Sequence, residues 1–337
     1  MRLLALALLG FAAISGADAS AATIDTVRAR GQLLCGVSSG LPGFSAPDER
    51  GAWKGLDVDV CRAVAAAVFG DATKVRFVPL STQQRITALQ TGEVDVLSRN
   101  LTWTMGRDAG NSINFGPTVY YDGQGFLVKK SANVTSIKSL NGATVCTGSG
   151  TTNDQNIADY ARANGISLRT LTTEKEEDGA HAFFGGRCDA LSADASQLAS
   201  FRASMVKNPD DYVILPELIS KEPLTPAVRH GDDQWFDILK WTVFALIQAE
   251  ESGVTSANID SFAKTTSPEL QRLLGYTGSM GKPLGLEDGW ARNAIKQVGN
   301  YGEIYERNVG KGSALKLDRG LNAQWNKGGL LYAPPIR

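Results

Sequence analysis

The apolar positions near the start of the chain predict strands and helices in alternation. Residues 33–37 form an apolar run of strand length, and the apolar residues at 56, 60, 64 and 68 recur every four residues, as on one face of a helix. The order is continued by a predicted strand at 74–78, a helix at 85–90 and a strand at 94–97. Strand, helix, strand, helix, strand is the order of a parallel α/β layer.

A second unit of the same kind follows along the chain. It reads as strand, glycine loop, helix, strand, helix, strand and helix at 143–146, 147–152, 154–163, 167–171, 175–184, 188–191 and 196–204. The glycine-bearing segment 120–125 predicts one crossover between the units, and 213–215 with 221–226 predict the return. Beyond it we expect residues 228–229 to re-enter the first unit, followed by helices at 234–250, 258–274 and 289–308 and an extended tail at 321–337.

These units predict an α/β protein of two lobes, each a mostly parallel sheet flanked by helices. Residues 23–123 and 225–337 would form lobe 1 with a C-terminal extension, and residues 124–224 would form lobe 2. The length of 337 residues agrees, because a chain of this size usually divides its core.

One short pattern occurs in both units. Residues 92–98 read Gly-x-x-Asp-x-Leu-Ser, and residues 186–192 repeat it. Two residues beyond the pattern, the first copy has Asn100 and the second has Asp194. The repeat predicts two lobes of similar construction, with these two residues in equivalent places.

The polar segment behind the first copy predicts a binding surface. The alternation of an extended chain places Asn100, Thr102 and Thr104 on one side. Arg107 follows, and a guanidinium beside hydroxyls and amides can bind a carboxylate through two hydrogen bonds. Together with Asp194, Arg107 would suit a ligand that carries both charges. The alternatives are a surface arginine and an aspartate that only caps the next helix.

Composition and the N-terminus narrow the function. The chain has 34 basic and 35 acidic side chains, so we expect no nucleic-acid partner. Arg2, an apolar run at 3–14 and small residues at 17–22 predict a signal peptide at 1–22. The apolar run is too short for a membrane span, which needs ~20 residues. We therefore expect an exported protein.

The cysteines and histidines bear on disulfides and metals. An exported chain with four cysteines favours disulfides, and three pairings are possible. Their positions favour Cys35 with Cys61 in lobe 1 and Cys146 with Cys188 in lobe 2, with four buried thiols as the alternative. Two histidines and no Cys-x-x-Cys spacing argue against a metal site, and we expect no cofactor.

Two loops are further candidates for the site. The glycine loop at 148–152 opens a helix, so its backbone N–H groups, with Thr151 and Thr152, could face a small ligand; an ordinary turn is the alternative. Leu41 and Phe44 could form an apolar wall, or simply pack in the core.

Other polar residues have simpler explanations. The acidic run at 174–178 is expected to be a solvated helix start, and Asp57 is available to cap the helix at 56–68. No catalytic triad or nucleophile elbow is present in the sequence, which favours a binding protein over an enzyme.

Several stretches together resemble one family: residues 35–44, 55–61, 88–100, 120–126, 150–152 and 299–305. The chain resembles the periplasmic amino-acid-binding components of ABC transporters, in particular the general L-amino-acid-binding subgroup of the family 3 solute-binding proteins. The resemblance covers nearly the whole mature chain. It implies the periplasmic binding protein fold, in which two lobes joined by two crossover strands close over one amino acid.

The resemblance also implies residue roles. The carboxylate-binding arginine of the family falls on Arg107, its ammonium-binding aspartate on Asp194, and its hydroxyl or amide donors on Asn100, Thr102, Thr104 and Thr152. The chain departs from the family at Leu41, Thr82 and Gly148, where rings or larger side chains are usual. These departures predict a roomy pocket and broad specificity.

The sequence thus predicts a monomeric periplasmic receptor that binds L-amino acids by cleft closure and delivers them to the permease of an ABC transporter. Two alternatives stay open. One is a secreted dehydratase-type enzyme on the same scaffold, and the other is a ligand-binding partner of a sensory receptor.

Overall fold

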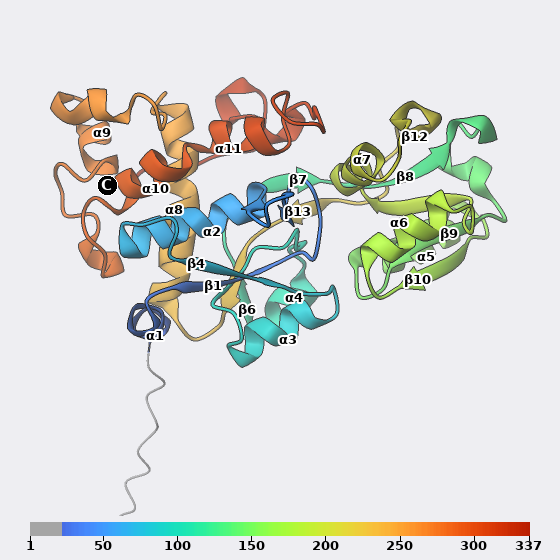
Figure 1. The fold of residues 1–337 in the computed structure, drawn as a ribbon, viewed down its shortest axis with the longest axis horizontal. Coiled ribbons are helices and arrows are strands. Elements are labelled where there is room, and N and C mark those ends of the chain that lie inside the picture. Colours follow the sequence, from blue (N-terminus) through green and yellow to red (C-terminus); the bar gives the residue numbers. More distant parts are fainter. Residues whose placement is uncertain (1–21) are drawn as a thin grey trace, which may run out of the picture.

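Two lobes lie side by side and are joined by a narrow ribbon of two strands (Figure 1). The computed structural model describes residues 22–337, so the predicted signal peptide lies outside the described residues except for its last position. Strands β7 (Tyr120–Asp122) and β13 (Glu222–Leu224) run antiparallel in the ribbon. The predicted two-lobed α/β fold is confirmed.

Lobe 1 is built on a five-stranded sheet in the order β4-β1-β5-β14-β6. The strands are β4 (Val75–Pro79), β1 (Leu33–Val37), β5 (Val96–Leu97), β14 (Ala227–Arg229) and β6 (Ile113–Phe115), and only β14 runs antiparallel to its neighbours. Its helices are α1 (Thr23–Arg30), α2 (Leu56–Phe69), α3 (Gln84–Thr91), α4 (Met105–Gly110), α8 (Asp233–Glu251), α9 (Pro268–Leu273), α10 (Trp290–Val298) and α11 (Tyr301–Asn308). A small hairpin pairs β2 (Ala46–Pro47) with β3 (Trp53–Lys54).

Lobe 2 repeats this plan with the strand order β10-β9-β11-β8-β12. Its strands are β10 (Arg169–Thr173), β9 (Thr144–Gly148), β11 (Ala190–Asp194), β8 (Gln124–Lys129) and β12 (Tyr212–Ile214), and its helices are α5 (Thr152–Asn164), α6 (Glu176–Phe184) and α7 (Ala195–Ser204). The prediction that 213–215 belong to the return crossover was wrong, because Val213 pairs with Val128 at the edge of this sheet. We propose lobe boundaries at 123/124 and 224/225, as the sequence predicts.

Short 3-10 helices connect the main elements. They lie at Lys130–Ala132, Ile137–Leu140, Pro209–Asp211, Ile259–Lys264, Lys282–Leu284, Gly320–Asn322 and Trp325–Lys327.

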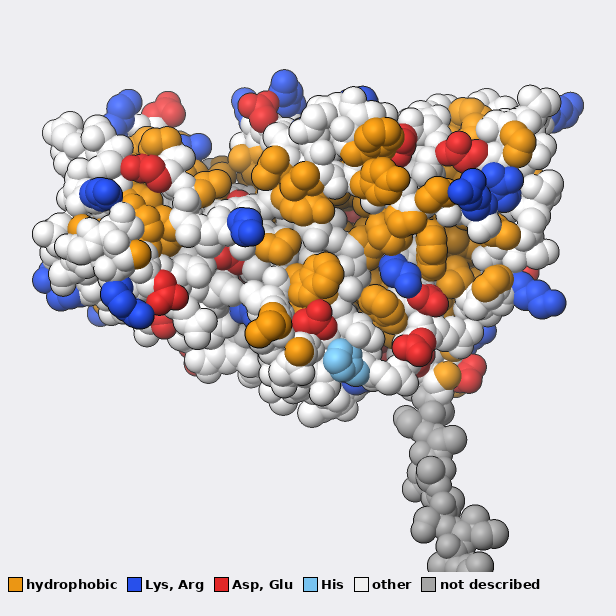
Figure 2. All heavy atoms as spheres, turned by 180° about the vertical axis from the view of Figure 1, so that it is seen from behind, with side chains coloured by type: hydrophobic (Ala, Val, Ile, Leu, Met, Phe, Trp, Pro, Cys, Tyr) orange, Lys and Arg blue, Asp and Glu red, His pale blue; other side chains and the backbone are white. Residues whose placement is uncertain are grey.

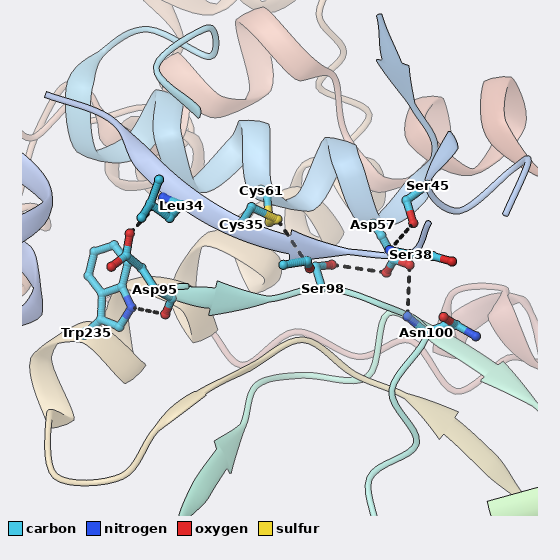
Figure 3. Close-up of a disulfide and its surroundings, with 11 residues drawn as sticks. Leu34, Cys35, Ser38, Ser45, Asp57, Cys61, Asp95, Ser98, Asn100 and Trp235 are labelled. Atoms are coloured by element: carbon cyan, nitrogen blue, oxygen red, sulfur yellow. Dashed lines mark hydrogen bonds between the residues drawn. A yellow bond between two sulfur atoms is a disulfide. The ribbon is translucent and has the colours of Figure 1, made fainter. Parts of the chain in front are cut away.

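The repeated sequence pattern has the same structural role in both lobes. The Asp95 carboxylate accepts a hydrogen bond from the backbone N–H of Leu34, 2.8 Å away in the neighbouring strand β1 (Figure 3). The Asp189 carboxylate does the same for Thr144 of β9, also at 2.8 Å. The strands β5 and β11 that follow these aspartates both lie at the centre of their sheets.

The predicted cysteine pairing is confirmed. Cys35 of β1 is bonded to Cys61 of α2, and Cys146 of β9 is bonded to Cys188, just before β11. Figure 3 shows the first disulfide between the strand and the helix that covers it. Each bridge therefore joins elements of a single lobe.

Two long helices predicted near the C-terminus are broken in the structure. The 258–274 helix ends after a 3-10 turn, and α9 begins anew at Pro268, where Ser267 accepts a hydrogen bond from the N–H of Leu270. The 289–308 helix breaks at Gly299, which has a φ of 93°. Asn300 then starts α11 through a capping box with Glu303.

The C-terminal extension, residues 310–337, reaches the ribbon between the lobes. Asn322 accepts a hydrogen bond from the N–H of Tyr121 at 2.6 Å and donates one to its carbonyl at 3.1 Å. Arg319 donates to Glu250 of α8 at 3.1 Å and lies over the ring of Tyr305, which stacks on Tyr120. The predicted extended arm thus contains two short 3-10 turns and binds both the ribbon and α8. We call residues 310–337 the clasp.

The surface carries charges of both signs. Figure 2 shows basic and acidic side chains intermingled over both lobes on one face, with hydrophobic side chains gathered over the larger lobe. Between residues 22 and 337, no helix combines the length and apolar character that crossing a membrane requires.

Candidate ligand site between the lobes

The two lobes touch directly, so the structure is a closed arrangement. Side-chain hydrogen bonds cross the boundary from Gln83 to Ser149 at 2.8 Å, from Ser39 to Glu177 at 2.8 Å and from Ser200 to the carbonyl of Pro42 at 2.7 Å. Residues that the sequence predicts for the site come from both sides of this boundary.

On the lobe 1 side, a buried carboxylate shapes the loop that follows β5. Asp57 accepts hydrogen bonds from the hydroxyl of Ser98 at 3.1 Å and from the N–H of Asn100 at 3.0 Å (Figure 3). Asn100 is held with a φ of 33°, in the left-handed region. Burial raises the pKa of Asp57 to about 6, although both hydrogen bonds oppose the rise. The prediction that Asp57 caps α2 was wrong, because its carboxylate serves this loop instead.

Arg107 is anchored to the same loop. One guanidinium nitrogen donates to the carbonyl of Thr102 at 2.9 Å, while the hydroxyl of Thr104 accepts from the N–H of Arg107 at 3.3 Å and caps α4. Thr102 is buried and bridges to Leu224 next to the ribbon. Asn100, Thr102 and Arg107 are thus brought together, and Thr104 also holds the start of the helix.

Arg107 lies in the electrostatic field of acidic residues from other parts of the molecule. Desolvation lowers its pKa, and the carboxylates of Glu222, Asp194 and Glu176 oppose that shift. Asp194 and Glu176 belong to lobe 2, and Glu222 belongs to the ribbon. The cation and the anion predicted from opposite lobes are therefore near enough for their charges to interact.

Asp194 is the last residue of β11 and is 4% exposed. Its carboxylate accepts from the side-chain amide of Asn153 at 3.1 Å and makes no capping bond to α7. Burial and the nearby charges of Asp122 and Glu222 raise the pKa of Asp194 well above its usual range. A bound cation would stabilise the ionised form.

Two carboxylates of the ribbon belong to this site and were missed by the sequence interpretation. Glu222 accepts from Thr152, Asn156 and Ser220 at 2.8, 2.9 and 2.6 Å, and it is fully buried. Burial raises the pKa of Asp122 to about 6. An acidic residue in a crossover segment is usually solvated, so no sequence signal marked either one.

Two buried arginines were also missed. Arg99 is 2% exposed; it donates to the carbonyl of Leu80 at 2.8 Å and to Thr82 at 3.4 Å. Arg85 reaches the carbonyl of Arg99 at 3.5 Å. One guanidinium nitrogen of each, Nε of Arg85 and Nη1 of Arg99, is buried without a hydrogen-bond partner among the described residues. The position of Arg99 next to Asn100 was the available signal.

The glycine loop places a glutamate in the site. Thr151 donates to the carbonyl of Gly148 at 2.7 Å, as in an ordinary turn. A Cβ on Gly148 would lie 2.8 Å from Cγ of Glu176, so this glutamate fills the space that a larger side chain would need. The expectation that Glu176 is solvated was wrong, because α6 begins at the lobe boundary and buries it to 8% exposure.

Leu41 and Phe44 lie in the core of lobe 1. Phe44 packs edge-on against the ring of Tyr120, with 5.3 Å between ring centroids, and Leu41 is 2% exposed. Core packing, the alternative raised by the sequence, describes these contacts, and a role in ligand binding stays a prediction. Within residues 22–337, no cluster of three or more metal-binding side chains is present.

Comparison with known proteins decides the family. The model of the bacterial extracellular solute-binding proteins, family 3, matches residues 33–259, which is more than half of the chain. The chain belongs to this solute-binding family. The membership predicted from the sequence is therefore confirmed.

Solute-binding relatives match almost the full length. The chain is 54% identical to the general L-amino acid-binding periplasmic protein AapJ of Rhizobium johnstonii, over 96% of each chain. It is 52% identical to the glutamate/glutamine/aspartate/asparagine-binding protein BztA of Rhodobacter capsulatus, over 97% of this chain and 96% of that protein. A solved structure, an ABC transporter periplasmic binding protein from Brucella ovis with glutathione bound, is 51% identical with a TM-score of 0.92, over 94% of this chain and all of that one.

Proposed function

We propose that this solute-binding protein is a periplasmic receptor that binds L-amino acids with broad specificity and delivers them to the permease of an ABC transporter. The observation that carries the proposal is the placement of Arg107 and Asp194, which come from different lobes into one closed site. The names of the relatives in Rhizobium and Rhodobacter support it.

The zwitterion of an amino acid matches this pair of charges. Its carboxylate would be bound by the guanidinium of Arg107, with the loop at Asn100 and Thr102 beside it. Its ammonium would be bound by Asp194. Both protein charges are partly or wholly desolvated, so each needs an opposite charge and hydrogen bonds for closure to be favourable.

Closure would then follow from the position of the charges. A ligand held by Arg107 alone contacts only lobe 1, and the bridge to Asp194 forms only when lobe 2 has closed. The ligand therefore shifts the open–closed equilibrium by its greater affinity for the closed form. A permease would recognise that closed form.

Buried cations favour a polar or acidic group at the other end of the ligand. Arg85 and Arg99 are 3% and 2% exposed, and each keeps a guanidinium nitrogen without a partner in the described part of the chain. The names of two relatives, for acidic amino acids and their amides and for bound glutathione, support ligands with such groups.

Three further expectations belong to the same proposal. The family supports export to the periplasm, where the mature chain would act as a monomer. We propose that the protein binds its ligand without chemistry, since Asp194 and Glu222 serve as acceptors in fixed hydrogen bonds. Mass spectrometry after incubation should return every bound ligand unchanged.

A thermal-shift screen of the twenty amino acids tests the proposal. Broad specificity predicts that several of them raise the melting temperature, because a ligand that binds only the folded state stabilises it by mass action. An Arg107→Ala variant is the control, and its melting temperature should not respond. If no amino acid stabilises the wild-type protein, the proposed function is wrong.

A further inference from the structure

The cleft contains an ion pair that joins the two lobes and is not needed to bind the amino-acid backbone. Nη2 of Arg99 lies 3.7 Å from a carboxylate oxygen of Glu176, and the two side chains are only 2% and 9% exposed. Arg99 follows β5 of lobe 1, and Glu176 begins α6 of lobe 2. The pair is therefore buried in the boundary that opens and closes.

This pair differs from two other polar side-chain contacts across the boundary. The hydrogen bonds from Ser39 to Glu177 and from Gln83 to Ser149 are 2.8 Å long and lie at exposed positions, where they can stabilise the contact between the lobes. The Arg99 to Glu176 contact is longer than a hydrogen bond, and Nη1 of Arg99 and Nε of Arg85 have no partner among residues 22–337. Glu176 pairs with Arg99 alone, while Arg85 lies against the carbonyl of Arg99, so each guanidinium keeps a nitrogen without a partner among the described residues.

Gly148 makes room for this arrangement. An added Cβ there would approach Cγ of Glu176 to 2.8 Å, so any larger residue would force the glutamate to move. The absence of a side chain at 148 therefore provides a resident carboxylate in the cleft, where the sequence alone predicts an open pocket.

We propose that Glu176 is a specificity-determining residue that lets one pocket accept acidic, basic and neutral ligand side chains. The inference rests on the proposed amino-acid-binding function and adds how side chains of opposite charge are tolerated. A ligand carboxylate binds the free donors of Arg85 and Arg99 in competition with Glu176. A ligand cation binds Glu176 in competition with Arg99. A small side chain leaves the pair intact.

The charge balance explains why removal of Glu176 should change the affinities for acidic and basic ligands in opposite directions. Without its carboxylate, the pocket loses the anion that pairs with Arg99, so its two guanidiniums attract an anion and repel a cation more strongly. If Glu176 only stabilised the contact between the lobes, its removal would change the affinities for all ligands by the same factor, since closure is common to all of them.

The test is calorimetry of Glu176→Gln with L-glutamate, L-arginine and L-alanine. We expect affinity to rise about tenfold for glutamate and to fall about tenfold for arginine, with alanine changed less than about threefold. Glu177→Gln is the matched control, because it removes a neighbouring carboxylate that also crosses the boundary. That variant should change the affinities for the three ligands by the same factor.

A second variant covers the case in which Glu176→Gln folds poorly. Gly148→Ala keeps every charge and crowds Glu176 in its present position, so we expect a weaker pair with Arg99 and the same order of ligand effects in weaker form. Parallel changes for all three ligands, or none, would overturn the inference. Wild-type protein that binds glutamate but not arginine would also overturn it, whereas wild-type protein that binds no amino acid refutes the proposed function itself.

Discussion

At the scale of single residues, Arg107 is the side chain on which ligand binding should depend most. It is tied to Thr102 within its own lobe and faces acidic residues of the other lobe and the ribbon. Arg107→Ala should weaken every amino-acid ligand by about 2–5 kcal/mol in calorimetry, because a desolvated carboxylate loses its partner. Arg107→Lys should recover part of the loss, since it restores the charge without the planar fork.

The control for this prediction is Arg162→Ala in α5. Arg162 is 78% exposed and pairs only with Asp159 on the same helix. Its removal should leave affinity unchanged. Equal affinities of wild type and Arg107→Ala would exclude Arg107 from the site.

Asp57 gives a prediction about pH and stability. Its pKa of about 6 in the folded protein is above the ordinary 3.8, so the folded state favours the protonated form. Its contribution to stability is therefore greatest below about pH 4 and is lost as pH rises through 6, by an amount on the order of 3 kcal/mol. The groups that face it are Ser98, Asn100, Arg85 and Arg99.

Urea unfolding of wild type and Asp57→Asn at pH 4.5 and 7.5 measures this effect. The variant cannot ionise, so its stability relative to wild type should increase between the two pH values. The protein must be ligand-free, because the pKa of Asp194 is also raised and ligand binding there would add its own dependence on pH. The idea fails if the two stabilities change in parallel.

The sequence predicted Arg107 and Asp194, which we propose bind the ligand backbone, and missed the buried residues that we propose surround its side chain. Asp194 follows the second copy of a repeated local pattern, and Arg107 follows the polar segment behind the first copy, so both could be found from their neighbours in the chain. Glu176 pairs with Arg99 across the lobe boundary and occupies the space beside Gly148, contacts that its neighbours in the chain do not reveal. An acidic run looks solvated when only its neighbours in the chain are considered.

At the scale of elements, periodicity predicted most strands and helices of both lobes to within a few residues, but it missed β6 and assigned β12 to the return crossover. It failed where a backbone signal interrupts a helical pattern. Gly299 has a positive φ and Asn300 is a helix cap, so one apolar periodicity covers two helices. Pro268 similarly starts α9, since a proline fits the first turn but not the middle of a helix.

The lobe 2 disulfide leads to a prediction that distinguishes the stability of lobe 2 from that of lobe 1. Cys146→Ala with Cys188→Ala should destabilise lobe 2 by ~2–4 kcal/mol, because the bridge closes a long loop of the unfolded chain. All six tryptophans lie in lobe 1, at 53, 103, 235, 241, 290 and 325. Thermal unfolding followed by far-UV circular dichroism should thus begin at lower temperature than unfolding followed by tryptophan fluorescence.

The matched variant is Cys35→Ala with Cys61→Ala. It removes the lobe 1 bridge and should lower the fluorescence transition instead. If both pairs shift both signals together, the two lobes unfold as one cooperative unit.

At the scale of the whole molecule, the C-terminal extension holds one of the two strands on which the lobes must turn. Asn322 binds both backbone groups of Tyr121, and Arg319 fixes the same extension to α8. The sequence could not predict this clasp, because it joins residues 201 positions apart without any local pattern. The two-lobed plan was predictable, because it rests on a repeated order of elements.

Asn322→Ala should loosen that hinge strand. Loss of both hydrogen bonds should lower stability by about 1–3 kcal/mol, because Tyr121 is left with unpaired backbone groups. The ligand-free protein should also sample more open arrangements, seen as a larger radius of gyration in small-angle X-ray scattering. Leu321→Ala, at a 56% exposed position of the same extension, is the control. An unchanged radius would show that the clasp does not restrain the lobes.

The ribbon has a consequence for the order in which the chain can fold during synthesis. Lobe 1 completes its sheet with β14, which lies beyond all of lobe 2 in the chain and pairs with β5. Lobe 2 has all five of its strands before that point. Once lobe 2 folds, Asp122 and Glu222 lie opposite each other in the ribbon. The two segments of lobe 1 are then held close together, as two strands are by a short turn. The inserted lobe thereby removes most of the loop-closure entropy that its host would otherwise lose.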